Sequence, residues 1–331
     1  MKQLKPLLLL IMVCTAVAAL MTLPASAVAT TQPSGGGEAL EIAPPRLELY
    51  GNPGQTIDAK LYLRDISSSP LIVNGTVDDF VAKGDSGTPQ IIINSNGSDP
   101  YSLKSYVGYI PNLLLQSKEL KILNIPINIP KNASPGGHYG VIRFTASPPP
   151  TSGGNRVSLS ASLGALILLT VSGKLVEHLN ITQFSVSQNN HQSNFFQSDP
   201  LTFSELVKNS GNIHVVPAGT LTVTDMFNKK LFVTNINRSQ GNVLPSSQRL
   251  FSQQLLPENI NNRIMFGRYT ASVAINYGLG NRTLYANMTF WVIPVKLIAI
   301  WIAVLIIGFF LLRWLIKRYN RYILEKAKNS K

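Results

Sequence analysis

The sequence predicts an all-β protein that contains two tandem β-sandwich domains and ends in one transmembrane helix. Three observations lead to this prediction. Between residues 46 and 293, apolar and polar residues alternate over short runs separated by turn residues, which is typical of half-buried strands. Several features of these runs recur at an offset of about 130 residues, which indicates a repeat. Residues 295–316 form an apolar segment long enough to cross a bilayer.

The N-terminal segment is typical of a secretory signal. Two lysines precede an apolar run over 7–20, and small residues at 25–27 fit a signal-peptidase site. We therefore assign 1–27 to a signal peptide, with cleavage after Ala27 or Ala29. An uncleaved anchor is the alternative.

The part between the signal and the apolar segment divides into a leader and two domains. Residues 28–44 are rich in small residues, Pro and Gly, which predicts a flexible leader. About seven short strands are expected in 45–175 and again in 176–293, which favours one immunoglobulin-like β-sandwich in each. The repeat supports this division, because 129–146 and 256–277 share an apolar-Pro pair, a following Asn and a Gly-x-Tyr strand start.

The two Gly-x-Tyr sequences predict structural corners. Gly137 and Gly267 are expected to supply turn conformations that side chains forbid. Tyr139 and Tyr269 are expected to send the hydroxyl to a nearby backbone group while the ring fills the core. The alternative is a pair of ligand-stacking tyrosines.

The apolar segment 295–316 predicts a single membrane span. Its residues 297–312 carry no charge, whereas a buried helix of a soluble protein, the alternative, is rarely apolar on every side. The tail 317–331 is strongly basic, which places it in the cytoplasm by the positive-inside rule. We therefore expect a single-pass protein of the cell membrane with residues 28–294 outside.

The charge distribution argues against nucleic-acid binding. The formal net charge is +13, but residues 28–294 hold 19 Lys and Arg against 15 Asp and Glu without a cluster. A nucleic-acid site needs basic residues gathered on one face. Most of the excess therefore relates to membrane topology.

The sequence contains no recognisable catalytic set. Cys14, the one cysteine, lies in the signal, so the mature chain has no disulfide, Cys-ligated metal or Cys nucleophile. The string Gly84–Gly87 resembles the nucleophile region of chymotrypsin-like proteases, but every histidine follows Ser86, whereas that family places its His first. We expect this string to form a turn. We also expect no metal, no cofactor, no small-molecule substrate and no enzymatic activity.

Two further sets of residues are candidates for binding. Asp78 and Asp79 could contribute to a calcium site, but adjacent side chains of a strand point to opposite faces. Tyr101, Tyr106 and Tyr109 form the densest aromatic cluster outside the span. Packing on the following strand and a ligand or partner surface both remain open for these tyrosines.

Residues 106–144 resemble the outer domain of WxL-interacting proteins of Gram-positive bacteria, and more loosely the immunoglobulin-like domains of pilus chaperones. The shared features are an aromatic-aliphatic segment, an apolar strand that ends in Pro, and a Pro-Gly-x-Tyr-Gly turn, here within 135–140. The order of signal, two sandwiches, span and basic tail is similar as well. The resemblance implies peptidoglycan binding by the first domain and partner or host binding by the second.

We therefore predict a membrane-anchored surface protein for binding or adhesion, which displays two β-sandwiches toward cell-wall polymer or a surface-protein partner. One alternative is a structural or accessory subunit of a membrane complex, held through the span. The other is an enzyme whose site the sequence does not reveal.

Overall fold

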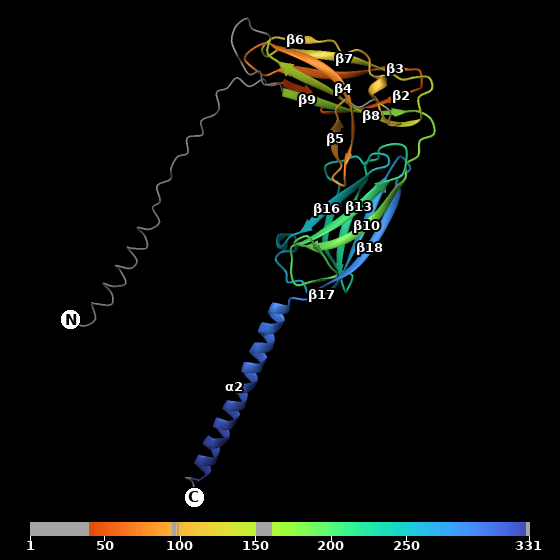
Figure 1. Ribbon diagram of the computed structural model, residues 1–331. Helices are drawn as coiled ribbons and strands as arrows, with labels where there is room; N and C mark the ends of the chain where they lie inside the picture. Colours follow the sequence, from red (N-terminus) through yellow and green to blue (C-terminus); the bar gives the residue numbers. More distant parts are fainter. Residues whose placement is uncertain (1–39, 95–96, 98, 150–160, 329–331) are drawn as a thin grey trace, which may run out of the picture. The chain divides into compact units, whose positions relative to one another are not determined.

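The computed structural model describes residues 40–94, 97, 99–149 and 161–328. The predicted signal peptide, the leader up to residue 39 and the last three residues of the tail lie outside these ranges. Strands make up most of the described chain, which ends in one long helix (Figure 1).

The first group of strands forms two sheets. Strands β1, β3 and β7 make an antiparallel sheet in the order β1-β3-β7. The second sheet has the order β2-β9-β8-β4-β5, with β6 also paired to β4; β2 runs parallel to β9 and the other pairs are antiparallel. The elements are β1 (Leu40–Ala43), β2 (Arg46–Gly51), β3 (Thr56–Asp65), β4 (Leu71–Lys83), β5 (Thr88–Ile92), the 3-10 helix η1 (Lys104–Tyr106), β6 (Leu113–Leu115), β7 (Leu120–Asn128), β8 (Gly136–Ser147) and β9 (Ala161–Val171).

Alternation along these strands produces the core of the first sandwich. In β3, Leu61 and Leu63 are fully buried while their neighbours face outward, as expected for a strand with one face on the core. Ile142 and Phe144 of β8 belong to the same buried cluster and come from the opposing sheet. Tyr139 lies on the other face of β8, in a separate small cluster.

The second group of strands also forms two sheets. Their orders are β11-β10-β13-β16 and β12-β18-β17-β14-β15. The elements are β10 (Leu179–Gln188), β11 (His191–Gln192), β12 (Phe195–Phe196), β13 (Leu201–Asn209), β14 (Ala218–Asp225), β15 (Lys230–Ile236), β16 (Gln248–Leu255), the 3-10 helix η2 (Pro257–Ile260), β17 (Gly267–Tyr277) and β18 (Arg282–Val292).

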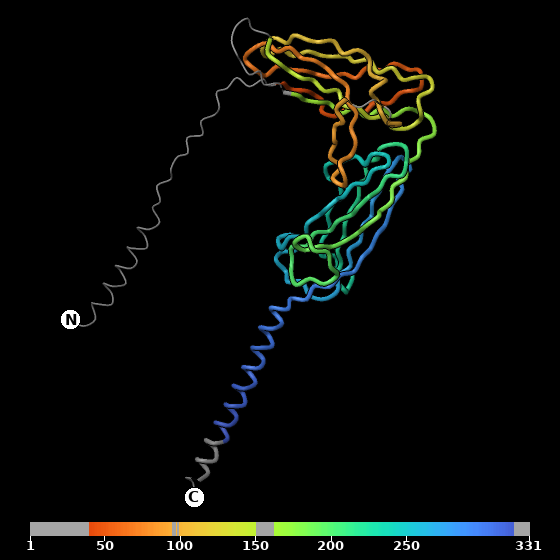
Figure 2. The backbone as a smooth tube through the Cα atoms, in the orientation of Figure 1, coloured from red at the N-terminus to blue at the C-terminus, as the bar shows by residue number. Residues whose placement is uncertain are grey.

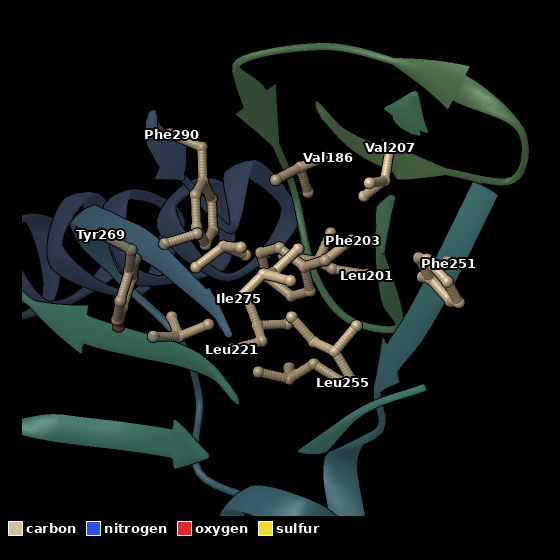
Figure 3. Packing of buried hydrophobic residues seen from close by; sticks show 14 of the residues in the cluster. Val186, Leu201, Phe203, Val207, Leu221, Phe251, Leu255, Tyr269, Ile275 and Phe290 are labelled. Atoms are coloured by element: carbon tan, nitrogen blue, oxygen red, sulfur yellow. The ribbon is translucent and has the colours of Figure 1, made fainter. Parts of the chain in front are cut away.

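The second core lies between these sheets (Figure 3). Phe203 of β13, Leu221 of β14 and Ile275 of β17 are fully buried and point toward one another. Phe203 and Phe290 meet edge to face, with ring centroids 5.7 Å apart. The all-β prediction with two tandem sandwiches is therefore confirmed.

The two sandwiches repeat one strand order. In the first, β2 lies parallel to β9 and is followed across the sheet by β8, β4 and β5. In the second, β12 lies parallel to β18 and is followed by β17, β14 and β15. The strands that carry Gly-x-Tyr, β8 and β17, hold equivalent places. The chain completes one sandwich before it begins the next (Figure 2).

Two predicted boundaries differ from the structure. Residues 40–43, assigned to the flexible leader, form β1, because this apolar stretch pairs with β3 and buries Leu40. The helix α2 (Val295–Lys328) begins where the span was predicted but continues well past 316. Residues 317–328 contain neither Gly nor Pro, so nothing in the sequence ends the helix there. Val295–Asn320 is long and apolar enough to cross a membrane and is unburied.

Candidate functional site

A cavity of ≈ 690 Å³ lies beside Tyr139. Its walls come from the end of β4, from β5, from the segment before η1 and from the segment that leads into β16. The lining residues are Asp79, Phe80, Val81, Ala82, Gly84, Asp85, Ile92, Asp99, Pro100, Tyr101, Ser102, Tyr139 and Leu244 to Gln248. This is the size range in which proteins hold a ligand or an anchor side chain of a partner.

The cavity combines an apolar wall with negative charge. Three carboxylates line it, and no Lys, Arg or His is among the described residues that do so. Asp79 accepts a hydrogen bond from Ser102 Oγ at 2.6 Å, and Asp85 Oδ1 accepts one from Gln248 Nε2 at 2.6 Å. These contacts hold the two carboxylates in place. A partner that brings a positive charge and apolar groups fits this lining.

The hairpin of β4 and β5 extends the apolar wall to the surface. β5 is the last strand of its sheet, and all five of its residues are exposed. Ile91, Ile92 and Ile93 are 39%, 40% and 62% exposed. Terminal strands with exposed apolar residues are sites at which an extended segment of a partner can pair.

The three candidate tyrosines do not form one cluster. Tyr101 lines the cavity, and its ring centroid is 6.4 Å from that of Tyr139. Tyr106 packs on the ring of His138 at 4.9 Å and on the first core, and burial raises the pKa of its hydroxyl. Tyr109 is 82% exposed. The structure thus places only Tyr101 at the cavity.

Tyr139 reaches a partner far away in the sequence. The side chain is 3% exposed, and its hydroxyl accepts a hydrogen bond from the backbone N–H of His214 at 2.8 Å. The same hydroxyl is 3.2 Å from His214 Nδ1. Burial lowers the pKa of His214, which keeps the imidazole neutral, so Nδ1 can accept the hydroxyl proton when Nε2 is protonated. The hydroxyl therefore joins the two sandwiches.

Tyr269 has the local partner that was expected for both tyrosines. Its hydroxyl accepts from the backbone N–H of Phe266 at 3.1 Å and donates to the Phe266 carbonyl at 3.4 Å. The ring stacks on Phe290 within the second core. Tyr139 differs because the segment before β8 is occupied by contacts with the second sandwich.

Gly137 and Gly267 exclude a side chain for different physical reasons. Gly267 has φ +101, a conformation that side chains rarely adopt. Gly137 has no positive φ; instead, a Cβ at this position would overlap the Tyr139 hydroxyl. The expectation that Gly137 supplies a turn conformation is therefore wrong. The position is restricted by a close approach that only the folded chain creates.

Asn212 makes further hydrogen bonds that join the two sandwiches. Its carbonyl accepts from the Gly137 N–H at 2.8 Å, and its side-chain amide donates to the carbonyls of Pro135 at 3.1 Å and Lys174 at 3.0 Å. Sequence reasoning identified neither Asn212 nor His214. The only local indication is the turn-forming run Ser-Gly-Asn at 210–212.

The other residues that the sequence singled out form a turn or make separate polar contacts. Gly84–Gly87 form the turn between β4 and β5. Asp78 and Asp79 point to different partners: Asp78 pairs with Arg143, Oδ2 to Nη2 at 2.8 Å, whereas Asp79 bonds Ser102. Among the described residues, no group of three or more His, Cys, Asp or Glu is arranged to hold a metal ion.

Comparison with known proteins gives fold likeness only. No family model matches the sequence, and no curated protein matches it. Similar solved structures include a chaperone-tip adhesin complex of CFA/I fimbriae biogenesis (13% identity, 75% of this chain and 98% of that chain, TM-score 0.40). The class 5 fimbriae chaperone CfaA has 15% identity over 75% of this chain and 98% of its own, with a TM-score of 0.39. The E. coli chaperone DraB has 13% identity over 77% and 97%, with a TM-score of 0.33. At these values the likeness says nothing about what this chain binds.

Proposed function

We propose that this chain is a single-pass membrane protein that binds a surface-protein partner through the cavity beside Tyr139 and the adjoining β5 edge. The observation that carries the proposal is the combination, in one place, of an open apolar strand edge, the Tyr101 ring and three carboxylates. An extended partner segment with apolar and basic side chains would satisfy all three. Binding of such a segment requires neither a catalytic residue nor a metal.

The arrangement that we propose for the chain in the cell is the one that its sequence predicts. The signal 1–27 is removed, the domains 45–175 and 176–293 stand outside, and 295–316 spans the membrane. The basic tail remains in the cytoplasm. The proposal that the sandwiches are presented at the surface draws support from α2, which is long and apolar enough to span, and from the excess of basic residues after it.

The residues at the cavity and the β5 edge favour one class of partner over the other. The resemblance to WxL-interacting proteins suggests two classes, cell-wall polymer and protein. A strand edge with exposed isoleucines favours protein, because a peptide can pair with the backbone while its side chains cover the apolar surface. Cell-wall polymer is the competing outcome of the test.

The test compares two isoleucine substitutions in the full chain solubilised in detergent. Ile92→Ser removes an apolar side chain from the cavity wall, whereas Ile122→Ser removes one that is 50% exposed on β7, away from the cavity. Both variants are exposed to a surface-protein extract and to purified cell wall. We expect the Ile92 variant alone to lose capture of a protein, and capture by the native chain to weaken with salt. Equal capture by both variants, or binding to purified wall alone, would contradict the proposal.

A further inference from the structure

The end of the second sandwich where β18 finishes exposes a group of large apolar side chains. Their exposed fractions are 83% for Phe227, 69% for Ile264, 65% for Phe195, 61% for Phe266 and 40% for Trp291. Single exposed apolar residues are normal on a protein, but large ones gathered at one end indicate a surface that something covers.

The strand registers place these residues at the same end. β12 pairs with β18 so that Phe195 faces Trp291, and the first residue of β17, directly after Phe266, faces Val292. β14 runs antiparallel to β17 and ends at Asp225 opposite Tyr269, so the β14–β15 turn with Phe227 joins the group. A Cβ on Gly267 would meet the Met226 side chain, which confirms that this turn lies against the start of β17.

The turn itself is built to present Phe227. Asp225 Oδ1 accepts hydrogen bonds from the backbone N–H groups of Phe227 and Lys229, each at 2.9 Å. This closes a tight turn whose tip is the phenylalanine. The hydrogen bonds fix the backbone of the turn, and the Phe227 ring at its tip is exposed although burial in the core would otherwise be favoured.

The chain connects this end directly to the apolar helix. Ile293 N–H donates to the Phe196 carbonyl at 2.8 Å, so the sandwich continues to that residue, and α2 begins at Val295 (Figure 1). Only Pro294 lies between Ile293 and Val295, so the Cα atoms of these two residues are at most about 7 Å apart. Whatever angle the helix takes, this end of the sandwich lies next to the point where α2 would enter lipid.

Charged residues around the apolar group are compatible with a bilayer surface. Lys229, Lys230, Arg263 and Arg268 are exposed at this end. The acidic residues there are Asp199, Asp225 and Glu258, and the first two are partly buried. Aromatic side chains with basic neighbours suit the interfacial region, where rings sit at headgroup level and cations meet lipid phosphates.

We propose that this end of the second sandwich rests on the outer face of the bilayer, with Phe227, Phe266 and Ile264 inserted among the headgroups. The inference rests on the membrane span of the proposed function. It adds a second attachment, which fixes how the sandwich stands on the membrane. The ligand is a phospholipid surface, recognised by apolar insertion and by a weakly basic rim.

The test uses single cysteines in the full chain with Cys14→Ser. An environment-sensitive fluorophore is attached in turn at Phe227→Cys, Phe266→Cys, Leu305→Cys or Leu279→Cys. Leu305 lies within α2, and Leu279 is 94% exposed in the β17–β18 turn, at the other end of the sandwich. The protein is reconstituted into phosphatidylcholine vesicles, with and without phosphatidylglycerol, in which lipids carry a quencher at a shallow or a deep position.

We expect labels at 227 and 266 to shift to shorter wavelength and to lose emission with the shallow quencher. The label at 305 should lose emission with the deep quencher, and the label at 279 should respond to neither. Labels at 227 and 266 that behave like the one at 279, while 305 is quenched, would overturn the docking and leave the span intact. No quenching at 305 would instead overturn the span.

If protein rather than lipid covers this end of the sandwich, the labels give a different fluorescence and quenching result. If a second copy covers this end, labels at 227 and 266 shift to shorter wavelength without lipid quenching, and the shift disappears when vesicles hold one chain each. That result would also overturn the proposal. Thermal unfolding of each labelled variant establishes that the fold is kept.

Discussion

At the scale of the residue, Tyr139 and Tyr269 show how one motif takes two roles. Both rings are buried at the start of equivalent strands. Tyr269 bonds Phe266, three residues earlier, whereas Tyr139 bonds His214, 75 residues later. The first tyrosine therefore stabilises the contact between sandwiches, and the second stabilises its own corner.

This difference predicts unequal effects of removing the hydroxyl. Tyr139→Phe leaves the buried N–H of His214 without a partner, which we expect to lower the free energy of unfolding by about 1 to 3 kcal/mol. Tyr269→Phe should cost less, because its half-buried partner can bond water. Thermal unfolding of the two variants in detergent measures the difference. A larger loss for Tyr269→Phe would contradict the roles assigned here.

Glu205 is a second residue whose environment has a measurable consequence. It is fully buried on β13 in line with Phe203 and Val207, and the Gln253 amide, oriented to donate, lies 2.7 Å from one of its carboxylate oxygens. Burial raises the pKa of Glu205 from 4.5 to about 8, although hydrogen bonds from its own backbone N–H and from Gln253 oppose the shift.

The raised pKa of Glu205 predicts a pH-dependent stability. Below about pH 4.5 the carboxyl is protonated in both the folded and the unfolded chain, so the fold carries no penalty. As the pH rises toward 8, the unfolded chain loses the proton first, and the free energy of unfolding falls. The full effect is roughly 3 to 5 kcal/mol.

Urea unfolding at pH 5 and pH 8 measures this dependence. Glu205→Gln should abolish most of it, while Glu258→Gln, on an exposed residue of η2, should leave it unchanged. An unaltered pH dependence in Glu205→Gln would show that another group causes it.

At the scale of the element, the beginning of β8 is restricted by packing on both faces. Gly136 to Ile142 are all buried, because one face lies on the first core and the other on the small cluster of Phe80, Tyr139, Val141 and Leu168. Most strands of the molecule bury one face only. Two successive glycines of β8 are restricted further, because a Cβ at Gly136 would meet the Asn212 carbonyl and a Cβ at Gly137 would meet the Tyr139 hydroxyl.

A methyl group added in β8 should therefore be costly. Gly137→Ala would force the Tyr139 hydroxyl from its place, and we expect a loss of about 1 to 3 kcal/mol in the free energy of unfolding. Gly280→Ala is the matched control, since Arg282 Cγ at 3.9 Å is its one close neighbour and its φ is not positive. Chemical denaturation compares the two; equal stabilities would show that Tyr139 can move without cost.

At the scale of the whole molecule, the proposed topology makes a direct prediction. Protease added to intact cells or protoplasts should digest residues 28–294 and leave a small basic C-terminal fragment protected by the membrane. Antibodies against a tag at residue 331 identify the fragment by immunoblot. A tag removed from intact cells would contradict the proposed orientation.

The sequence by itself determined the strand-rich architecture, its repetition and the position of the apolar helix, because alternation and apolar run length are properties of neighbouring residues. The tertiary structure decided the partner of Tyr139, the reason for Gly137 and the separation of Tyr101 from Tyr106 and Tyr109. It also decided that residues 40–43 join a sheet. Each of these outcomes depends on contacts between segments that lie tens of residues apart, such as β8 and the loop at His214. The packing of the sheets brings such segments together, and no residue pattern within either segment predicts the contact.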